Sequence, residues 1–335
     1  MSDYDLNFPF AYGGPVLTAD FRSRPEDFVV DEQLGFQPCG EGEHVFLHLQ
    51  KRGDNTEWLA RQIARLAEVM PMDVGYCGLK DRHAVTTQWF SVYLPKGEEP
   101  DWSALNSETV SLLSKHRHNK KLRRGQHQSN RFVITLRNIV GEISTAKLSK
   151  ILTDGVPNYF GEQRFGHGGN NLVEADAFLR GERKIKNRPR RGMYMSAARS
   201  WLFNQVLVAR LGLESKDWSS PLPGEPEAFG SGPLWGRGRA LPRDEALQLE
   251  TEAMAPWQVW CEALEHVGLK QERRALRLLP LRADWALLPP SESDTGPGLR
   301  LSFELPPGTY ATAVLREVAI LNNLSVRANA PEPAG

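Results

Sequence analysis

Hydrophobic and polar residues alternate along several short stretches in the first half of the chain. Residues 44–50 follow a strict period of two, which predicts a strand. Residues 55–70 instead place their apolar side chains on one helical face, with Asn55 as a plausible N-cap, which predicts an amphipathic helix. Further strands are predicted at residues 19–33 (one or two strands), 73–79, 85–94 and 132–136, and a further helix at 145–153.

From residue 155 the pattern changes from strands to helices. Strand-like segments return near the end of the chain and precede a last helix. Because the strands are not spaced by regular helices, a doubly wound parallel sheet is disfavoured, and the order predicts an α+β fold interrupted by a largely helical insertion. The elements predicted here are helices at 172–179, 196–211, 257–267, 271–278 and 311–321, a Pro- and Gly-rich loop at 219–243, and strands at 281–288 and 299–305.

One loop between two predicted strands concentrates charge. Asp81 is directly flanked by Lys80 and Arg82, and His83 follows. A free aspartate has a pKa of about 3.9, so this carboxylate is expected to be ionised at neutral pH, and the neighbouring cations favour that state. An ionised carboxylate on a rigid loop can act as a nucleophile, a base or a metal ligand. A solvated turn with interleaved charges is the simpler interpretation of the same residues.

The chain has no net charge, with 41 Lys and Arg against 41 Asp and Glu, but the charges are segregated. Residues 115–141 hold eight Lys or Arg and no acid, and residues 180–199 hold eight against the single Glu182. Such runs allow a neutral protein to present a basic face to phosphates, although solvated loops, expected at 115–128, are the alternative. The candidate phosphate contacts are Lys120, Lys121, Arg123, Arg124, Arg188, Arg190 and Arg191.

Composition bears on the compartment in which the protein is expected and on whether it binds a metal. No run approaches the roughly 18 apolar residues that a membrane helix needs, and the first residues lack the apolar core of a secretory signal. Cys39, Cys77 and Cys261 are far apart, match no zinc spacing and suit a reducing compartment. We therefore expect a cytoplasmic protein without a bound metal.

The charged loop belongs to a longer motif, GLKDRHAVTTQW at residues 78–89, which closely resembles the active-site motif of the TruD family of tRNA pseudouridine synthases. Other segments that resemble the family occur in the same order from Pro25 to Glu317. One of them is NYFGEQRFG at residues 158–166. The resemblance covers almost the whole chain. It implies a pseudouridine-synthase core with a mixed, mainly antiparallel sheet, an inserted TRUD domain, isomerisation of uridine at tRNA position 13, and no cofactor.

The resemblance also implies a catalytic group. Asp81 matches the family's catalytic aspartate, and Arg22 stands where a basic partner, Lys in other members, is expected. A guanidinium can pair with a carboxylate in a bidentate way that an ammonium cannot. Lys80 is the rival for this role. Whether the carboxylate attacks C1′, attacks C6 or abstracts the 2′ proton is left open.

Three further residues match positions that contact the substrate in the family. A uridine inside folded tRNA must leave its stack before it can react, and stacking on aromatic rings then holds the base. Phe28 matches one such ring, and Tyr310 stands where a second, expected as Phe, would lie. Asn130 matches an asparagine whose amide reads the uracil edge. Without the motifs, core packing and an ordinary turn would be the usual roles of such residues.

The aligned motifs imply a division of the chain and a set of partners. Residues 1–154 and 279–328 would form the catalytic core, 155–278 the inserted domain, and 329–335 a disordered tail. The implied partner is tRNA, with no membrane, no obligate protein partner and a monomeric state. A non-catalytic RNA-binding protein or chaperone is the main alternative. A carboxylate-dependent glycosidase is a third, but it would need two acids flanking the bond, and the motif around Asp81 holds no second acid.

Overall fold

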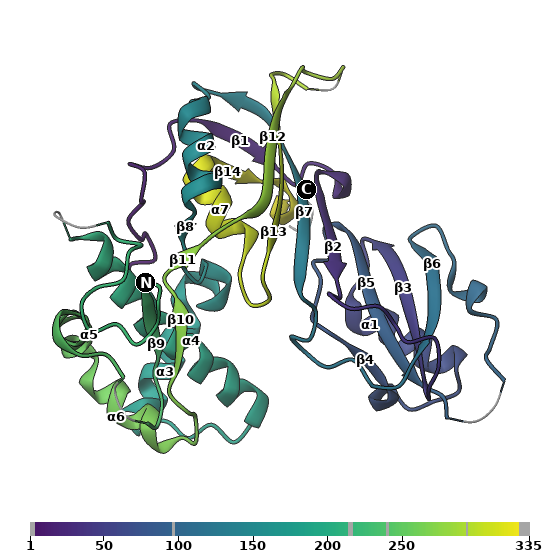
Figure 1. Cartoon of the computed structure of the whole chain (residues 1–335), viewed down its shortest axis with the longest axis horizontal. Helices are drawn as coiled ribbons and strands as arrows, with labels where there is room; N and C mark the ends of the chain where they lie inside the picture. Colours follow the sequence, from purple (N-terminus) through teal and green to yellow (C-terminus); the bar gives the residue numbers. More distant parts are fainter. Residues whose placement is uncertain (1–3, 96–97, 214–216, 239–240, 293, 328–335) are drawn as a thin grey trace, which may run out of the picture. The chain divides into compact units, whose positions relative to one another are not determined.

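The computed structural model of the chain describes residues 4–95, 98–213, 217–238, 241–292 and 294–327 (Figure 1). Contacts between residues divide it into two compact units, each built from segments far apart in the sequence. The sheet unit consists of the described residues of Val16–Thr145, Pro280–Gly308 and Ala319–Gly335, and the helical unit of those of Met1–Pro15, Ala146–Leu279 and Thr309–Val318.

In the sheet unit, ten strands among the described residues form one mixed sheet. Seven follow the order β12–β13–β7–β2–β5–β3–β6, while β1 pairs with β7 and β14, and β4 pairs with β5. The β1–β14 and β2–β5 pairs are parallel, and the other pairs are antiparallel. The strands are β1 (Thr18–Phe21), β2 (Phe28–Gln33), β3 (His44–Arg52), β4 (Val74–Tyr76), β5 (Val85–Tyr93), β6 (Val110–His118), β7 (Ser129–Val140), β12 (Leu281–Leu288), β13 (Gly298–Leu305) and β14 (Ile320–Asn323), and a short helix, α8 (Leu324–Arg327), follows.

Helix α1 (Thr56–Leu66) packs against the β3–β5 part of this sheet. Leu59 and Ile63 from its apolar face join Leu47 and Phe90 in one buried cluster. Complete burial of such a side chain stabilises the fold by about 1.5–3 kcal/mol. The helix therefore holds β3 and β5 in place. Residues at the end of β3 and just before the start of β5 belong to the candidate site.

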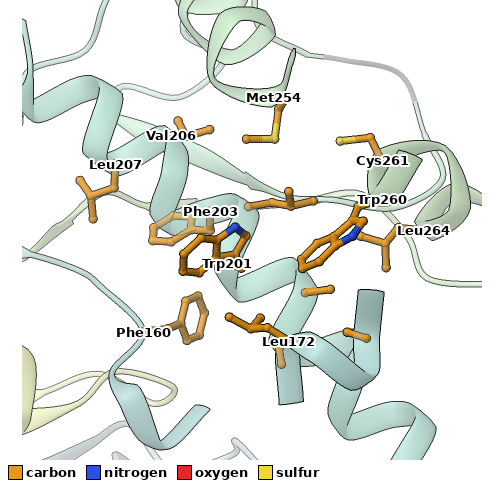
Figure 2. Packing of buried hydrophobic residues seen from close by; sticks show 14 of the residues in the cluster. Phe160, Leu172, Trp201, Phe203, Val206, Leu207, Met254, Trp260, Cys261 and Leu264 are labelled. Atoms are coloured by element: carbon orange, nitrogen blue, oxygen red, sulfur yellow. The ribbon is translucent and has the colours of Figure 1, made fainter. Parts of the chain in front are cut away.

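The helical unit is organised around the long helix α4. Trp201 and Phe203 of α4 pack with Leu172 of α3 and Trp260 of α6 in a large buried cluster (Figure 2). Two short antiparallel pairs, β9–β10 and β8–β11, complete the unit. Its elements are α2 (Thr145–Asp154), β8 (Val156–Pro157), α3 (Asn170–Leu179), α4 (Arg188–Leu211), β9 (Ser231–Leu234), α5 (Asp244–Met254), α6 (Gln258–His266), β10 (Glu272–Ala275), β11 (Arg277–Leu278) and α7 (Ala311–Val318).

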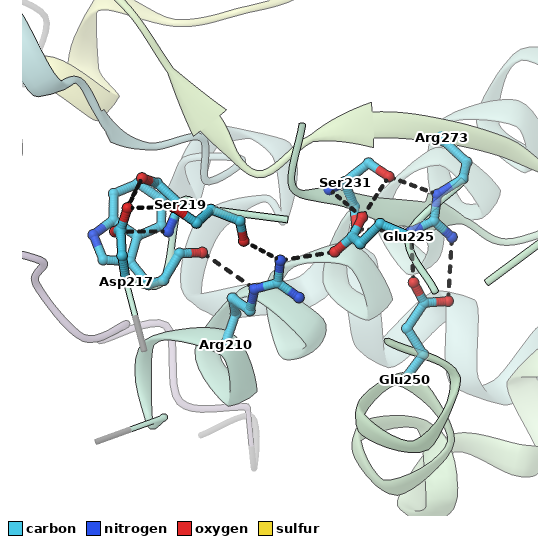
Figure 3. Close-up of polar contacts among 9 residues, drawn as sticks. Arg210, Asp217, Ser219, Glu225, Ser231, Glu250 and Arg273 are labelled. Atoms are coloured by element: carbon cyan, nitrogen blue, oxygen red, sulfur yellow. Dashed lines mark hydrogen bonds and ion pairs between the residues drawn. The ribbon is translucent and has the colours of Figure 1, made fainter. Parts of the chain in front are cut away.

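Buried ion pairs link the loops of the helical unit to its helices (Figure 3). Arg210 of α4 lies 2.7 Å from Glu225, and Arg273 of β10 lies 2.6 Å from Glu250 of α5. All four side chains are nearly inaccessible to water. Arg210 also donates to two backbone carbonyl groups, and Ser231 donates its backbone N–H to Glu225. Each charge is therefore neutralised and hydrogen-bonded.

The prediction of a helix at residues 271–278 is wrong. The segment forms β10 and β11, which pair with β9 and β8. Its residues favour a helix locally, but the extended backbone lets Arg273 reach both Glu250 and the carbonyl oxygen of Ser231. Tertiary hydrogen bonding outweighs local propensity here.

Other predicted elements shift at their ends. The predicted loop at 115–128 is partly a strand, because β6 continues to His118 in register with β3. The predicted helix at 311–321 ends at Val318, because the next residues pair with β1 as strand β14. Helix α4 begins at Arg188, earlier than predicted, and α5 was not predicted. The predicted tail at 329–335 lies outside the described residues.

The α+β class is confirmed, with a mainly antiparallel sheet and a helix-rich second part. Across the part of the chain that the structure describes, no helix combines the length and the apolar character that crossing a bilayer requires. The domain boundaries at 154, 278 and 328 stay predictions; contacts place Ala146–Leu279 in the helical unit, together with Met1–Pro15 and Thr309–Val318.

Candidate active site

The parallel pairing of β2 with β5, two central strands of the sheet, brings two distant segments together at one end of these strands. Val29 of β2 lies opposite Val85 of β5. Because the strands run in the same direction, the residues that precede each of them meet at the same end. Arg22 precedes β2 and Asp81 precedes β5, so this register places the predicted partners side by side.

Asp81 is held through both oxygens of its carboxylate. Oδ1 accepts the backbone N–H of His83 at 3.0 Å, which closes a local turn. Oδ2 accepts Nη2 of Arg22 in a close ion pair. The Asp81 side chain is 28% exposed, whereas that of Arg22 is 8% exposed. The carboxylate is therefore anchored from behind and keeps access to solvent.

Arg22 occupies an unusual position for a charged residue. Its backbone has a φ of 59°, in the left-handed region that non-glycine residues seldom adopt. Its guanidinium carbon lies 4.7 Å from the ring centre of Phe21 and 4.6 Å from that of Phe28, within cation–π range. Burial lowers the pKa of Arg22, and the Asp81 carboxylate opposes that shift. Backbone strain stored at such a contact is typical of functional sites.

Lys80 forms its ion pair with Glu32 and not with Asp81. Its ammonium forms a close ion pair with Oε2 of Glu32, and both side chains are buried. Oε1 of Glu32 accepts the backbone N–H of Trp89 at 3.1 Å. Burial raises the pKa of Glu32, while the ammonium and the amide oppose the rise. The structure thus pairs Arg22, and not its rival Lys80, with Asp81.

Asn130 lies on β7 directly opposite Glu32. Its Nδ2 is 3.0 Å from Nε2 of His127, and its Oδ1 has no hydrogen-bond partner among the described residues. Burial, with Lys80 nearby, lowers the pKa of His127 to about 4, so the ring is neutral and Nε2 can accept the amide proton. The amide oxygen of Asn130 is itself buried, and its capacity to accept a hydrogen bond is unused among the described residues.

One group of side chains in the described part of the chain has the spacing of metal ligands. Ligand atoms of Glu32, Cys77 and His127 all lie within 4.8 Å of one another, and the three residues are buried. Glu32 already binds the Lys80 ammonium, and burial raises the pKa of Cys77 to about 12, with the Glu32 carboxylate adding to the rise. A neutral thiol beside an occupied carboxylate is a poor cation site, because metal ligands must be deprotonated and available.

Phe28 is buried in the free protein, at 5% exposure. Its ring packs edge-on against Phe21 and tilts against Phe132, while Arg22 covers it from a third direction. The preceding residue, Asp27, binds Arg137 of β7 through both carboxylate oxygens and fixes the turn before β2. These contacts place Phe28 against the residue that pairs with Asp81; its contact with a base stays a prediction.

Tyr310 belongs to the helical unit. Its hydroxyl accepts Nη2 of Arg164 at 2.6 Å, and its ring packs edge-on against Phe160. Arg164 also donates to Oγ of Ser196. Arg164 and Phe160 both come from the NYFGEQRFG motif, so this motif surrounds Tyr310. The hydroxyl that distinguishes Tyr310 from the expected Phe thus has a partner, as a half-buried phenol requires.

The candidate phosphate contacts lie in two segments. In the connection between β6 and β7, Leu122 is buried and donates its N–H to Ser91. Lys120, Arg123 and Arg124 are exposed, whereas Lys121 is half-buried and donates to the carbonyl oxygen of Met72. Arg188, Arg190 and Arg191 are exposed in the first turn of α4, behind the N-cap Asn187. A cation near a helix N-terminus interacts unfavourably with the helix dipole and destabilises the helix by about 0.3–1 kcal/mol. These three arginines therefore do not serve to stabilise α4, which favours another role for them.

Sequence reasoning missed Lys51, at the end of β3. It is 1% exposed, and its Nζ donates to the carbonyl oxygens of Asp54 at 2.6 Å and Asp81 at 3.0 Å. A signal was present in the sequence. Along β3, every second residue before Lys51 (Val45, Leu47 and Leu49) belongs to the core, so the period of two predicts that Lys51 also points inward.

Thr56 and Gln88 hold the other end of the loop. Oγ1 of Thr56 accepts the backbone N–H of Lys80 at 3.0 Å and donates to Gln88, whose amide donates to the carbonyl oxygen of Gly78. The loop before β5 is therefore bound through its backbone at Gly78, Lys80 and Asp81. A carboxylate on so rigid a support can act as a positioned nucleophile or base.

Comparison with known proteins gives first the fold of this chain and then its family. The chain matches a crystal structure described as a putative tRNA pseudouridine synthase D (TruD) from Methanosarcina mazei, with a TM-score of 0.68, 92% of this chain and 95% of that chain covered, and 19% identity. At that identity the match shows the fold alone. A family model described as tRNA pseudouridine synthase D (TruD) matches residues 9–185.

Two relatives named tRNA pseudouridine synthase D are similar along nearly their full length. The protein of Cellvibrio japonicus is 50% identical, over 99% of this chain and 98% of its own. That of Nitrosococcus oceani is 47% identical, over 92% of this chain and 93% of its own. The chain belongs to the TruD family of tRNA pseudouridine synthases. The predicted family, and with it the isomerase class, is confirmed.

Proposed function

We propose that this protein converts uridine 13 of tRNA to pseudouridine, with Asp81 as the catalytic carboxylate. The observation that carries the proposal is the Asp81–Arg22 pair before the central strands β2 and β5, where the carboxylate is fixed by two contacts and remains partly open. The match to relatives named tRNA pseudouridine synthase D supports the choice of substrate.

The reaction rearranges the nucleoside without net gain or loss of atoms. The bond between N1 and C1′ breaks, the uracil rotates, a bond forms between C5 and C1′, and the proton on C5 is exchanged for one on N1. A single ionised carboxylate suffices, as a nucleophile at C1′ or C6 or as a base toward the 2′ proton. In each case Arg22 favours the ionised state of Asp81 and orients it, because an adjacent cation stabilises the anion.

The substrate base must leave the helical stack to reach Asp81. We assign the uracil edge to Asn130, whose amide oxygen is free to accept a hydrogen bond. Phe28 and Tyr310 are assigned to the base as aromatic contacts, which are worth about 1–3 kcal/mol per stacked base. Because Phe28 is buried beside Arg22, truncating it would also loosen the ion pair with Asp81.

Binding of the tRNA backbone is assigned to the two exposed basic segments, 120–124 and 188–191. Lys and Arg on such segments neutralise phosphates and make affinity dependent on salt. The catalytic core would then comprise 1–154 and 279–328, with the TRUD domain at 155–278. Since the proposed substrate is tRNA, we place the protein in the cytoplasm. We propose that it acts as a monomer.

The test is pseudouridine mapping of unmodified tRNA after incubation with the purified protein or its Asp81→Asn variant. We expect the modification at position 13 with the wild type and none with the variant. Modification elsewhere would overturn the position, and equal modification by the variant would remove Asp81 from the mechanism. Binding of tRNA without any turnover would favour the alternative, a non-catalytic RNA-binding protein.

A further inference from the structure

A buried lysine lies directly behind the catalytic loop. Lys51 is the last core-facing residue of β3, opposite Thr86 of β5, and is 1% exposed. An ammonium at such a site loses most of its hydration, which is costly unless other groups replace the water. An apolar residue would continue the row of Val45, Leu47 and Leu49 more simply. The presence of a lysine here therefore needs a reason beyond packing.

The partners of Lys51 are backbone oxygens. Its Nζ donates to the carbonyl oxygens of Asp54, at 2.6 Å, and Asp81, at 3.0 Å, and it forms no ion pair with a carboxylate among the residues that the structure describes. The charged groups that face it are Asp81, Asp54 and Lys80. Carbonyl oxygens replace only part of the lost hydration, so the ammonium keeps an unbalanced positive charge close to Asp81.

We propose that Lys51 is a positioning residue for Asp81: its ammonium clamps the Asp81 carbonyl oxygen and adds positive potential behind the carboxylate. The inference rests on the proposed function of Asp81. The clamp acts on the backbone of the catalytic residue itself, whereas Arg22 acts on its side chain. Together they restrain the carboxylate from two directions, and a small displacement of such a group can lower a rate about 100-fold.

Protonation of Lys51 should control both activity and stability. Burial lowers the pKa of Lys51 to about 8, and Asp81 and Asp54 oppose the shift while Lys80 adds to it. Below that pH the clamp is charged, and above it the clamp is neutral. The unfolded chain, with a lysine pKa of about 10.4, binds more protons than the folded one between pH 8 and 10, so stability should rise with pH in that window. Activity and stability should thus move in opposite directions.

The experiment compares the wild type with Lys51→Met and Lys51→Arg on unmodified tRNA, in single turnover from pH 6 to 9.5. We expect Lys51→Met to lower the rate of the chemical step about 10- to 100-fold at pH 7, with unchanged tRNA affinity, and to lack the decline seen in the wild type above pH 8. Lys51→Arg keeps its charge through this range, so it should restore part of the rate and also lack the decline.

The control is Lys147→Met, since Lys147 of the helical unit also donates to a backbone carbonyl, that of Gly14. This variant should turn over like the wild type. Urea unfolding of Lys51→Met should show a stability equal to or above the wild type at pH 7, and no rise from pH 8 to 10. The inference fails if Lys51→Met matches the wild-type rate, keeps the alkaline decline, or loses rate only in proportion to its unfolded fraction. A wild type that forms no pseudouridine would instead overturn the proposed function.

Discussion

Two groups of buried positive charges in this protein are treated differently, one in the helical unit and one around Asp81 in the sheet unit. In the helical unit, Arg210 and Arg273 each face a buried carboxylate, and Ser231 completes both pairs by donating its backbone N–H to Glu225 and accepting hydrogen bonds from Arg273 (Figure 3). Around Asp81 in the sheet unit, Arg22 faces a carboxylate that stays 28% exposed, and the hydrogen bonds of the Lys51 ammonium within the described part of the chain go to carbonyl oxygens. We call the first arrangement closed, because both members of each pair are buried, and the second open or incomplete, because the Asp81 carboxylate stays partly exposed and Lys51 forms no ion pair among the described residues.

This difference distinguishes charges that stabilise the fold from charges that can act on a ligand. A closed pair recovers the cost of desolvation within the protein, so its charges have no interaction left for a ligand. An incomplete one leaves electrostatic potential directed at whatever enters the site, which is the arrangement that catalysis uses. By this criterion, pairs in the helical unit should govern stability, and those around Asp81 should govern turnover.

The largest effect is expected at the open pair. Asp81→Asn removes the negative charge while preserving shape, and should lower turnover by at least about 1,000-fold because no other carboxylate takes its place. Affinity for tRNA should stay within about threefold. Pseudouridine mapping and a binding titration measure the two quantities, with Glu57→Gln, an exposed acid on α1, as the matched control. A comparable loss in the control would show that general charge, and not this site, is responsible.

The next effect is expected at a closed pair. Glu250→Ala leaves the buried Arg273 without its carboxylate and should destabilise the protein by about 3–5 kcal/mol. Replacing both residues with Met should recover much of this loss. Urea unfolding of the single and double variants gives the comparison, and turnover per folded molecule should not change. If the single variant instead lost turnover at full stability, the distinction between the units would break down.

A smaller effect is expected from the partner of Asp81. Arg22→Met removes the guanidinium and should lower the rate of the chemical step about 10- to 100-fold through misorientation of the carboxylate. Arg22→Lys keeps a cation where the family is expected to have Lys, so it should recover most of the rate. Single-turnover measurements with both variants decide the point. Equal rates for Met and Lys would show that charge at this position is irrelevant.

The smallest effect is expected at the exposed basic segment. Changing Lys120, Lys121, Arg123 and Arg124 together to Gln should reduce the slope of log affinity against log salt by up to about 3.6, because each lost phosphate contact removes about 0.7–0.9. Turnover at saturating tRNA should be unaffected. Titrations at several salt concentrations test this, with the exposed Arg61→Gln on α1 as the control. An unchanged slope would place this segment away from the RNA.

Much of the outline could be predicted from the residues alone. The strict alternation at residues 44–50 and the apolar face at residues 55–70 are local patterns, so they predict the strand and the helix that the structure forms as β3 (His44–Arg52) and α1 (Thr56–Leu66). The segment Glu272–Ala275 was predicted as a helix because its strand partners lie far away in the sequence, and no local pattern reports them. Likewise, Glu32 gave no signal of its pairing with Lys80, 48 residues later.

The sequence by itself determined the family and the class of fold, and it marked Asp81 as the candidate catalyst, because a long motif and periodic side chains are properties of neighbouring residues. Only the tertiary structure decided that Arg22 and not Lys80 faces Asp81, and that Lys51 lies behind it. The reason is geometric. These contacts exist only when parallel β2 and β5 and antiparallel β3 adopt their register, and a shift of one residue would turn each side chain to the opposite face.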